Sequence, residues 1–380
     1  MQQTLSETES KASQLSLNAA SQPVDQAAEA SLLHRSFGLD AARAVAISLV
    51  LMAHFSHKSL DSLGFWGVEL FFALSGYLIG QILWRNYSQA SHWTRHHIAN
   101  FWYRRWWRTL PNYYLFLLVL LFQQWQNGKV PSLAELSSFL WFGQDLLERN
   151  YGFYSQSWSL CIEEWFYLLF PLVLFGFTKL GLKPKSAFLL VLLTFFVGSA
   201  LVRTSVLDLK LMLATREITF ARLDAIAFGV AIAYLQSLVE LDVKKRILLF
   251  AVGGGLLLVS IGAVHAEGYT TLRGYWPLVS VPLGFACLLP LISLWQMPTG
   301  WLRYAALGAK KISLWSYSIY LSHAPIMWVF YELMAKQRSS FYGNLLSKVL
   351  GLAVTLVVSG LLYNFFEIPL TKKRPAEIKA

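Results

Sequence analysis

Residues 37–55 read FGLDAARAVAISLVLMAHF, an apolar run close to the length of about 20 residues that a helix needs to cross a bilayer. Arg43 and His54 lie eleven positions apart within this run. A helix would carry both side chains on one face, about 16 Å apart along its axis, with Asp40 on the same stripe. Ionisable groups inside a membrane segment are costly and often mark a functional site, but a structural Asp40–Arg43 ion pair at the membrane edge explains the pattern equally well.

The composition of the whole chain predicts an all-α membrane protein. Of its 380 residues, 56% are hydrophobic and 14% are charged, whereas a soluble domain carries about a quarter charged residues. The net charge of +11 comes from basic residues scattered between apolar runs, which favours the edges of membrane spans over a nucleic-acid surface. Cys161 and Cys287 lie in apolar runs without metal-ligand spacing, so neither a disulfide framework nor a metal site is expected.

Apolar runs of spanning length recur to the end of the chain and predict a bundle of ten transmembrane helices. The predicted spans are 37–55, 63–84, 109–126, 158–178, 186–206, 222–239, 246–264, 276–296, 312–334 and 346–366. Two further helices, 92–107 and 133–147, are expected along the interface. The domain organisation that follows is a disordered polar cytoplasmic tail (1–36), a membrane domain (37–370) and a short basic cytoplasmic tail (371–380).

The distribution of basic residues predicts the orientation of the bundle. Cytoplasmic loops of membrane proteins are enriched in Lys and Arg, and the densest clusters here all fall on one side of the predicted layout. They lie at 104–108, 183–185, 244–246, 310–311 and 372–374. We therefore expect both termini in the cytoplasm of a multi-pass protein of the cell (inner) membrane. The loop after the fifth span, which also carries several basic residues, fits this orientation least well.

The segment FWYRRWWRTLP, residues 101–111, is a candidate anion-binding element. Arg104 and Arg108 are four residues apart and share a helix face, and two guanidiniums match phosphate oxygens better than two ammonium groups would. Pro111 is expected to interrupt or restart this helix. The alternative is an interfacial anchor, since arginines mixed with Trp and Tyr are typical of helices at the membrane surface.

Four carboxylates and one histidine lie within or beside the predicted spans. Glu69 lies among aromatic residues of the second span, and Glu367 lies at the cytoplasmic edge of the tenth. Glu163 and Glu164 are adjacent, and because neighbours on a helix differ by about 100° in direction, at most one should point squarely into a site. His323 is expected at mid-membrane depth. Each carboxylate has a structural alternative as the ion-pair partner of a nearby arginine.

Seven sequence blocks together resemble the signature of the integral-membrane acyltransferase family 3. The blocks are LDAARAVAISLVLMAH (39–54), GFWGVELFFALSGYLIG (64–80), FWYRRWWRTLP (101–111), SQSWSLCIEEWFYLLFP (155–171), RLDAIAFGVAIAYL (222–235), SYSIYLSHAP (316–325) and FFEIPL (365–370). They occur in the family's order over most of the chain. The resemblance implies a bundle of about ten helices that takes an acyl group, commonly acetyl, from cytoplasmic acyl-CoA and transfers it to a hydroxyl of a glycan, glycolipid or similar acceptor.

The resemblance also implies roles for particular residues. The family's Arg-x10-His element falls on Arg43 and His54, of which His54 is the histidine regarded as essential for transfer, and the donor-binding arginines fall on Arg104 and Arg108. The acidic catalytic positions fall on Glu69 and Glu163. The positions that match in pattern and are expected to support the site are Asp40, Arg222, His323 and Glu367. Asp224, in the same block as Arg222, also matches.

Histidine chemistry agrees with this assignment. Transfer from a thioester to an alcohol needs a base for the hydroxyl proton or a nucleophile that carries the acyl group, and a neutral imidazole can do either. His54 is expected in one of these two roles, with a carboxylate such as Glu69 orienting it, and His57 is a rival. No cofactor is expected beyond acyl-CoA as donor substrate, and no protein partner is indicated. The alternative function is a transporter or flippase for a lipid-linked sugar, with Asp40, Arg43, Glu69 and His54 forming its path.

Overall fold

The computed structural model describes residues 36–89, 93–149, 152–205, 215–267 and 275–378. The tail predicted for residues 1–36 lies outside these ranges except for Ser36. Within them the chain is helical and contains no strand. The predicted all-α class is therefore confirmed for the described part of the chain.

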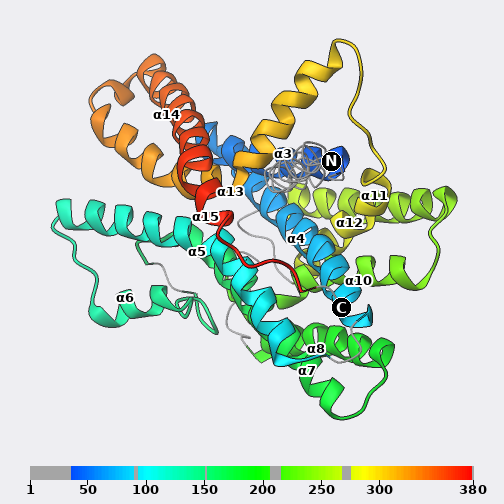
Figure 1. The fold of residues 1–380 in the computed structure, drawn as a ribbon. Coiled ribbons are helices and arrows are strands. Elements are labelled where there is room, and N and C mark those ends of the chain that lie inside the picture. The colour runs from blue at the N-terminus through cyan, green and yellow to red at the C-terminus, as the bar shows by residue number, and fades with distance from the viewer. Residues whose placement is uncertain (1–35, 90–92, 150–151, 206–214, 268–274, 379–380) are drawn as a thin grey trace, which may run out of the picture.

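Each of the ten predicted segments is a helix in the structure (Figure 1). The helices are α3 (Phe37–Phe55), α4 (Ser62–Gln89), α5 (Arg95–Gln126), α7 (Trp158–Lys179), α8 (Pro184–Ser205), α10 (Leu223–Leu238), α11 (Val243–Glu267), α12 (Trp276–Ile292), α13 (Leu302–Leu333) and α14 (Phe341–Leu362). Shorter pieces are α6 (Leu133–Leu140), α15 (Ile368–Thr371), the 3₁₀ turns Lys58–Leu60, Ser155–Ser157 and Gln337–Ser339, and a π-helical turn, Tyr363–Glu367.

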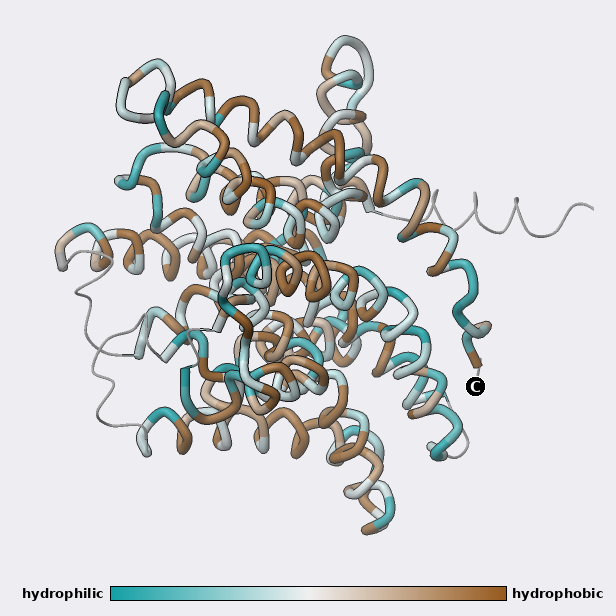
Figure 2. The backbone as a smooth tube through the Cα atoms, turned by 90° about the vertical axis from the view of Figure 1, so that its left-hand side faces the viewer, coloured by the Kyte–Doolittle hydropathy of each residue, from teal (hydrophilic) through white to brown (hydrophobic). Residues whose placement is uncertain are grey.

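In the described part of the chain, six helical stretches are long and apolar enough to cross a membrane, and we therefore describe the chain as a membrane protein. They are Phe37–Phe55, Lys58–Gln89, Ser155–Lys179, Pro184–Ser205, Val243–Ala266 and Phe341–Thr371. Two further apolar helices, α10 and α12, have 16 and 17 residues. Figure 2 shows apolar residues along the lengths of the helices and hydrophilic residues at many of the turns that join them.

Two predictions about the interfacial helices are wrong. The segment predicted as 92–107 and the third span form one continuous helix, α5, which runs for 32 residues through Pro111. Proline removes the hydrogen bond to the carbonyl four residues earlier, here that of Trp107, and its ring crowds that carbonyl, but the helix continues on both sides of Pro111. The helix predicted over 133–147 ends at Leu140, and the next turn contains Phe142 in a left-handed conformation with φ of 59°.

Helix α4 lies at the centre of the bundle, where it packs against α3, α10 and α12 (Figure 1). Its crossing with α10 depends on glycine at both contact points. A Cβ built on Gly76 would lie 2.0 Å from the carbonyl oxygen of Ile226, and one built on Gly229 would lie 2.3 Å from that of Ala73. The two backbones can approach this closely only because neither glycine has a side chain.

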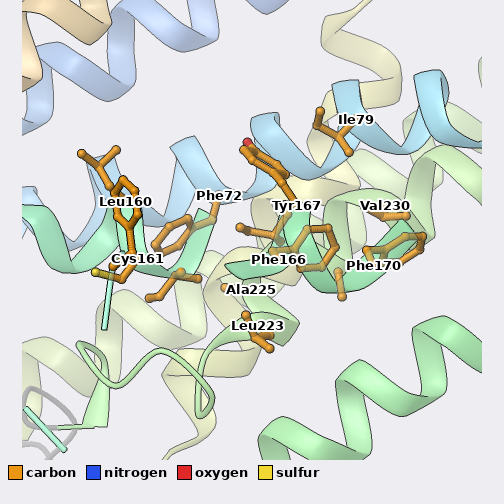
Figure 3. Packing of buried hydrophobic residues seen from close by; sticks show 14 of the residues in the cluster. Phe72, Ile79, Leu160, Cys161, Phe166, Tyr167, Phe170, Leu223, Ala225 and Val230 are labelled. Carbon is orange, nitrogen blue, oxygen red and sulfur yellow. The ribbon is translucent and has the colours of Figure 1, made fainter. Parts of the chain in front are cut away.

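The largest buried cluster joins α4 to α7 and α5 through aromatic side chains. Figure 3 shows part of it, with Phe72 and Ile79 on α4 and Phe166, Tyr167 and Phe170 on α7. The Tyr167 hydroxyl hydrogen-bonds with that of Ser75 on α4. This packing fixes the inner faces of α4 and α7, which form walls of the cavity described below.

Candidate active site

The predicted ion pair on α3 is present and is joined to α13. Arg43 Nη1 lies 3.0 Å from Asp40 Oδ1. The Ser313 hydroxyl donates to the same carboxylate oxygen over 3.0 Å and accepts from Arg43 Nη1 over 3.3 Å. Asp40 is buried, with 1% of its surface exposed. The carboxylate thus holds the Arg43 guanidinium in place. Arg43 also lines the larger of two adjoining cavities in the bundle.

This larger cavity has a volume of about 370 Å³ and lies between α3, α4, α5, α7 and α13. One part of its wall is apolar and comes mainly from α4, including Val68, Phe71 and Phe72. The polar part consists of hydroxyl groups and four charged side chains. The charged residues are Arg43, Arg105, Arg108 and Glu163. The cavity can therefore hold a ligand with an apolar portion and an anionic end.

A smaller cavity of about 140 Å³ adjoins the larger one. The two have Ile82, Arg105 and Arg108 in common, so the arginines lie at the junction. Arg104 lines only the smaller cavity, which is closed on one side by residues 374–378 of the C-terminal segment. The predicted pair Arg104 and Arg108 is thus brought to one site, with Arg108 reaching both cavities.

Arg105, which the sequence pattern did not single out, lines both cavities. Its spacing of three residues from Arg108 places these two side chains on one helix face as surely as the spacing of four does for Arg104 and Arg108. This spacing predicts that Arg105 and Arg108 share a helix face, but it does not indicate which face of the helix packs against α4 and α7. The guanidinium of Arg105 lies 5.5 Å from the centre of the Tyr167 ring, within range of a cation–π contact.

The adjacent glutamates of α7 point to different places, as predicted from the helical rotation. Glu163 lines the larger cavity. Glu164 is buried and accepts a hydrogen bond of 2.7 Å from the Thr109 hydroxyl, and it lines a third cavity beside Trp106 and Trp165 instead. Of the two, Glu163 is the one that faces the arginines.

His54 lies at the far end of α3 from Arg43 and does not line the cavities described above. Its side chain is exposed on one side, and its ring lies 4.9 Å from the ring of His323 on α13. The ring of His323 lies 5.8 Å from that of Tyr320, which lines the larger cavity. A row of three rings therefore joins the cavity wall to His54.

His323 is held in one orientation by the backbone of α13. Its Nδ1 lies 2.6 Å from the carbonyl oxygen of Tyr320. A carbonyl only accepts, so Nδ1 carries the proton and donates, which leaves Nε2 with a lone pair. Only 1% of this residue is exposed, and Nε2 has no hydrogen-bond partner among the described residues. The ring that packs against it is that of the candidate catalytic residue His54.

The rival residue His57 has a local structural role. Its Nδ1 accepts a hydrogen bond of 3.3 Å from the backbone amide of Ser59 and caps the short 3₁₀ turn that follows α3. The side chain is exposed. Unlike His54, it makes no ring contact with another described residue that would connect it to the cavity.

Glu69 is engaged in a fully buried ion pair rather than in contact with His54. Arg222 Nη2 lies 2.5 Å from Glu69 Oε2, and the exposed fraction of both side chains is 0%. Arg222 Nη1 also donates to the carbonyl of Leu278. These bonds join α4 to the start of α10 and to α12.

The remaining predicted residues are Glu367, in the π-helical turn after α14, and Asp224, in the first turn of α10. Glu367, in the π-helical turn, accepts hydrogen bonds of 2.8 Å from the Ser318 hydroxyl and 3.2 Å from the amide of Asn112. Glu367 therefore joins the π-helical turn to α13 and α5. Asp224 forms an ion pair of 2.7 Å with Arg203.

Comparison with known proteins identifies the family. Residues 36–364 match the family described as an acyltransferase domain. O-acetyltransferase OatA of Staphylococcus aureus is 26% identical over 379 residues, an alignment that covers 88% of this chain and 57% of the relative. Peptidoglycan O-acetyltransferase OatA of Listeria monocytogenes is 25% identical over 368 residues, with 88% and 55% covered.

The chain thus spans little more than half the length of these relatives. No solved structure matches it. The family match extends from the residue before α3 to the π-helical turn that follows α14, and so includes Arg43, His54, the arginines of α5 and His323. The chain therefore belongs to this family of acyltransferases.

Proposed function

We propose that the chain is a membrane-embedded O-acyltransferase. It moves an acyl group, in the first instance acetyl, from cytoplasmic acyl-CoA to a hydroxyl of a glycan, glycolipid or related acceptor at the membrane. One observation carries the proposal: in a chain of an acyltransferase family, a cavity with an apolar wall ends at Arg105 and Arg108. Guanidiniums bind phosphate oxygens in bidentate fashion, and a CoA thioester combines phosphates with a long uncharged arm.

The proposed topology has ten spans with both termini in the cytoplasm of the cell (inner) membrane, and the membrane domain extends over 37–370. Contacts between residues far apart in the sequence support this layout. Arg85 pairs with Glu377 at the end predicted to be cytoplasmic, whereas Lys348 bonds to the carbonyl of Ser56 at the opposite end. Accessibility of single cysteines to impermeant reagents tests the layout, which is wrong if residues 104–108 are labelled from outside.

The acceptor is proposed from the relatives and from the position of His54. The relatives of Staphylococcus aureus and Listeria monocytogenes are named O-acetyltransferases, the latter of peptidoglycan. A glycan hydroxyl is therefore the favoured acceptor class for this chain. His54 is exposed at the end of α3 opposite to the arginines, which suits an acceptor that approaches from the non-cytoplasmic side.

In the proposed reaction, His54 is the catalytic residue. As a base, its unprotonated nitrogen takes the proton of the acceptor hydroxyl while the hydroxyl oxygen attacks the thioester carbonyl carbon. The C–S bond then breaks, and the CoA thiolate takes up the proton. As a carrier, the same nitrogen attacks the thioester carbonyl carbon, and the C–S bond breaks to give an acyl-imidazole and the thiol. The acceptor hydroxyl oxygen then attacks the acyl carbon, the C–N bond breaks, and the imidazole is regenerated as the ester forms. In both cases the thioester arm must pass Tyr320 and His323, since these rings lie between the cavity and His54.

Replacing the arginines at the junction of the cavities should weaken donor binding. Arg105→Lys and Arg108→Lys keep the charge but lose the bidentate geometry. We expect each to weaken acetyl-CoA binding by about 1.5–3 kcal/mol, the range for a hydrogen bond to a charged group. Arg303→Lys is the matched control, because Arg303 is exposed on α13 and lines none of these cavities. Equilibrium binding of labelled acetyl-CoA to protein in nanodiscs measures the effect.

Two outcomes would contradict this proposal. Unchanged affinity in both junction variants would leave α5 with only the role of an interfacial anchor. If the wild-type protein does not bind acetyl-CoA, the donor is of another kind or the chain is a transporter, the alternative that needs no donor site.

A further inference from the structure

The C-terminal segment covers a cluster of hydrogen-bond donors at the ends of α4 and α5. Figure 1 shows this segment, after α15, passing between the two helices. The donors beneath it are Arg85 and Asn86 on α4 and Asn100 and Arg104 on α5. Arg85, Asn86 and Asn100 do not line the larger cavity.

These four side chains hold oxygen atoms of the segment. Glu377 Oε1 accepts a hydrogen bond of 2.8 Å from Arg85 Nη2 and one of 3.0 Å from Asn86 Nδ2. Its other carboxylate oxygen, Oε2, lies 3.6 Å from Arg104 Nη2. Arg104 Nη1 donates to the carbonyl of Pro375 over 2.7 Å, and Asn100 Nδ2 donates to that of Ala376 over 2.8 Å. The cluster is therefore already an oxyanion site, with a carboxylate as its occupant.

The charge of the cluster exceeds that of its occupant. Burial lowers the pKa of Arg374, and the nearby guanidiniums of Arg104 and Arg108 lower it further. Partial burial alone would raise the pKa of Glu377, but hydrogen bonds from Asn86 and Arg85 and the arginine charges lower it overall. One carboxylate thus lies among several guanidiniums. The excess positive charge favours a ligand that carries more negative charges than Glu377 does.

The cluster is continuous with the proposed donor cavity. The smaller cavity is lined by Asn86, Asn100 and Arg104 from the cluster and by Glu377 from the segment. It also contains Arg105 and Arg108, which line the larger cavity. A molecule with phosphates in the smaller cavity could extend its uncharged arm into the larger one.

We infer that Arg85, Asn86, Asn100 and Arg104 bind the phosphates of the donor's nucleotide end, and that Glu377 occupies this site in the absence of donor. The inference rests on the proposed function and extends it from the junction arginines to the ends of α4 and α5. It makes the C-terminal segment a competitor of the acyl donor, since the carboxylate oxygens and the phosphate oxygens would accept hydrogen bonds from the same side chains. The segment must leave before the donor can bind.

Glu377→Gln tests this competition, because it removes the charge and keeps the size of the side chain. We expect the variant to bind acetyl-CoA and adenosine 3′,5′-bisphosphate about 2- to 5-fold more tightly than wild type, the factor for loss of a partly exposed ion pair. Glu240→Gln is the matched control, with an exposed carboxylate outside the cavities. In the other direction, Arg85→Gln should weaken binding of the bisphosphate, which lacks the thioester arm.

The results separate the inference from the proposed function. If wild type binds acetyl-CoA, but Glu377→Gln and Arg85→Gln change the affinity for neither probe, the inference is wrong and the donor proposal stands. If neither wild type nor Glu377→Gln binds acetyl-CoA, the proposed function fails and the inference fails with it. Tighter binding of both probes by Glu377→Gln, together with weaker binding of the bisphosphate by Arg85→Gln, supports both.

Discussion

The His54→Ala variant is expected to bind acetyl-CoA with the affinity of wild type but to lose acyl transfer by about 10²–10⁴-fold, the usual contribution of a general base. The side chain lies outside the arginine-lined cavities and is partly exposed, so its removal leaves the donor site and the core intact. Donor affinity and the rate of CoA release, measured on the same reconstituted protein, give the two values.

His57→Ala is the control for this variant. Its imidazole caps a turn at the surface, so we expect activity close to that of wild type. An inactive His57→Ala beside an active His54→Ala would assign the catalytic role to His57. Activity in both variants would eliminate a histidine mechanism.

The largest effect on stability is expected from Arg222→Ala. Its guanidinium is the partner of Glu69, and neither side chain is exposed to solvent. Removing one partner of a buried pair leaves an uncompensated charge, which costs about 3–5 kcal/mol of unfolding free energy. A fall of this size in the free energy of unfolding should appear in equilibrium denaturation of the protein in mixed micelles.

A double variant separates the charge from the packing. In Glu69→Gln/Arg222→Met both charges are gone while the volumes are nearly kept, and exchange of a buried ion pair for neutral groups is often tolerated. We therefore expect the double variant to be more stable than Arg222→Ala. Equal stability of Arg222→Ala and wild type would show that the pair does not support the contact of α4 with α10.

The sequence predicted the helices well because the length of an apolar run is a local property. Each predicted span coincides with a helix to within a few residues, except that α5 and α13 begin well before the predicted spans. The failure at Pro111 has a physical reason, since proline costs one backbone hydrogen bond and does not dictate a break when neighbouring helices hold both sides. The turn after α6 depends on Phe142 and its packing against Tyr113, which no local pattern reveals.

For the site, spacing along a helix predicted which residues share a face but not what that face meets. The Asp40–Arg43 pair is local and was foreseen as an alternative. The partner of Glu69 is Arg222, 153 residues later, and Glu377 reaches Arg85 from 292 residues away. Such pairs depend on the packing of the whole bundle. Arg105 reaches the larger cavity and Arg104 does not, which likewise depends on where α4 and α7 lie.

The rate at which the reconstituted protein releases CoA from acetyl-CoA, with water in place of the acceptor hydroxyl, tests the central claim most directly. Arg105→Ala/Arg108→Ala and His54→Ala serve as the paired variants. We predict that wild type releases thiol faster than protein-free vesicles do, that the arginine variant loses release through weaker donor binding, and that His54→Ala loses it with donor binding intact. Release by folded wild-type protein at the rate of empty vesicles, or an unchanged rate in both variants, would contradict acyl transfer from CoA at this site.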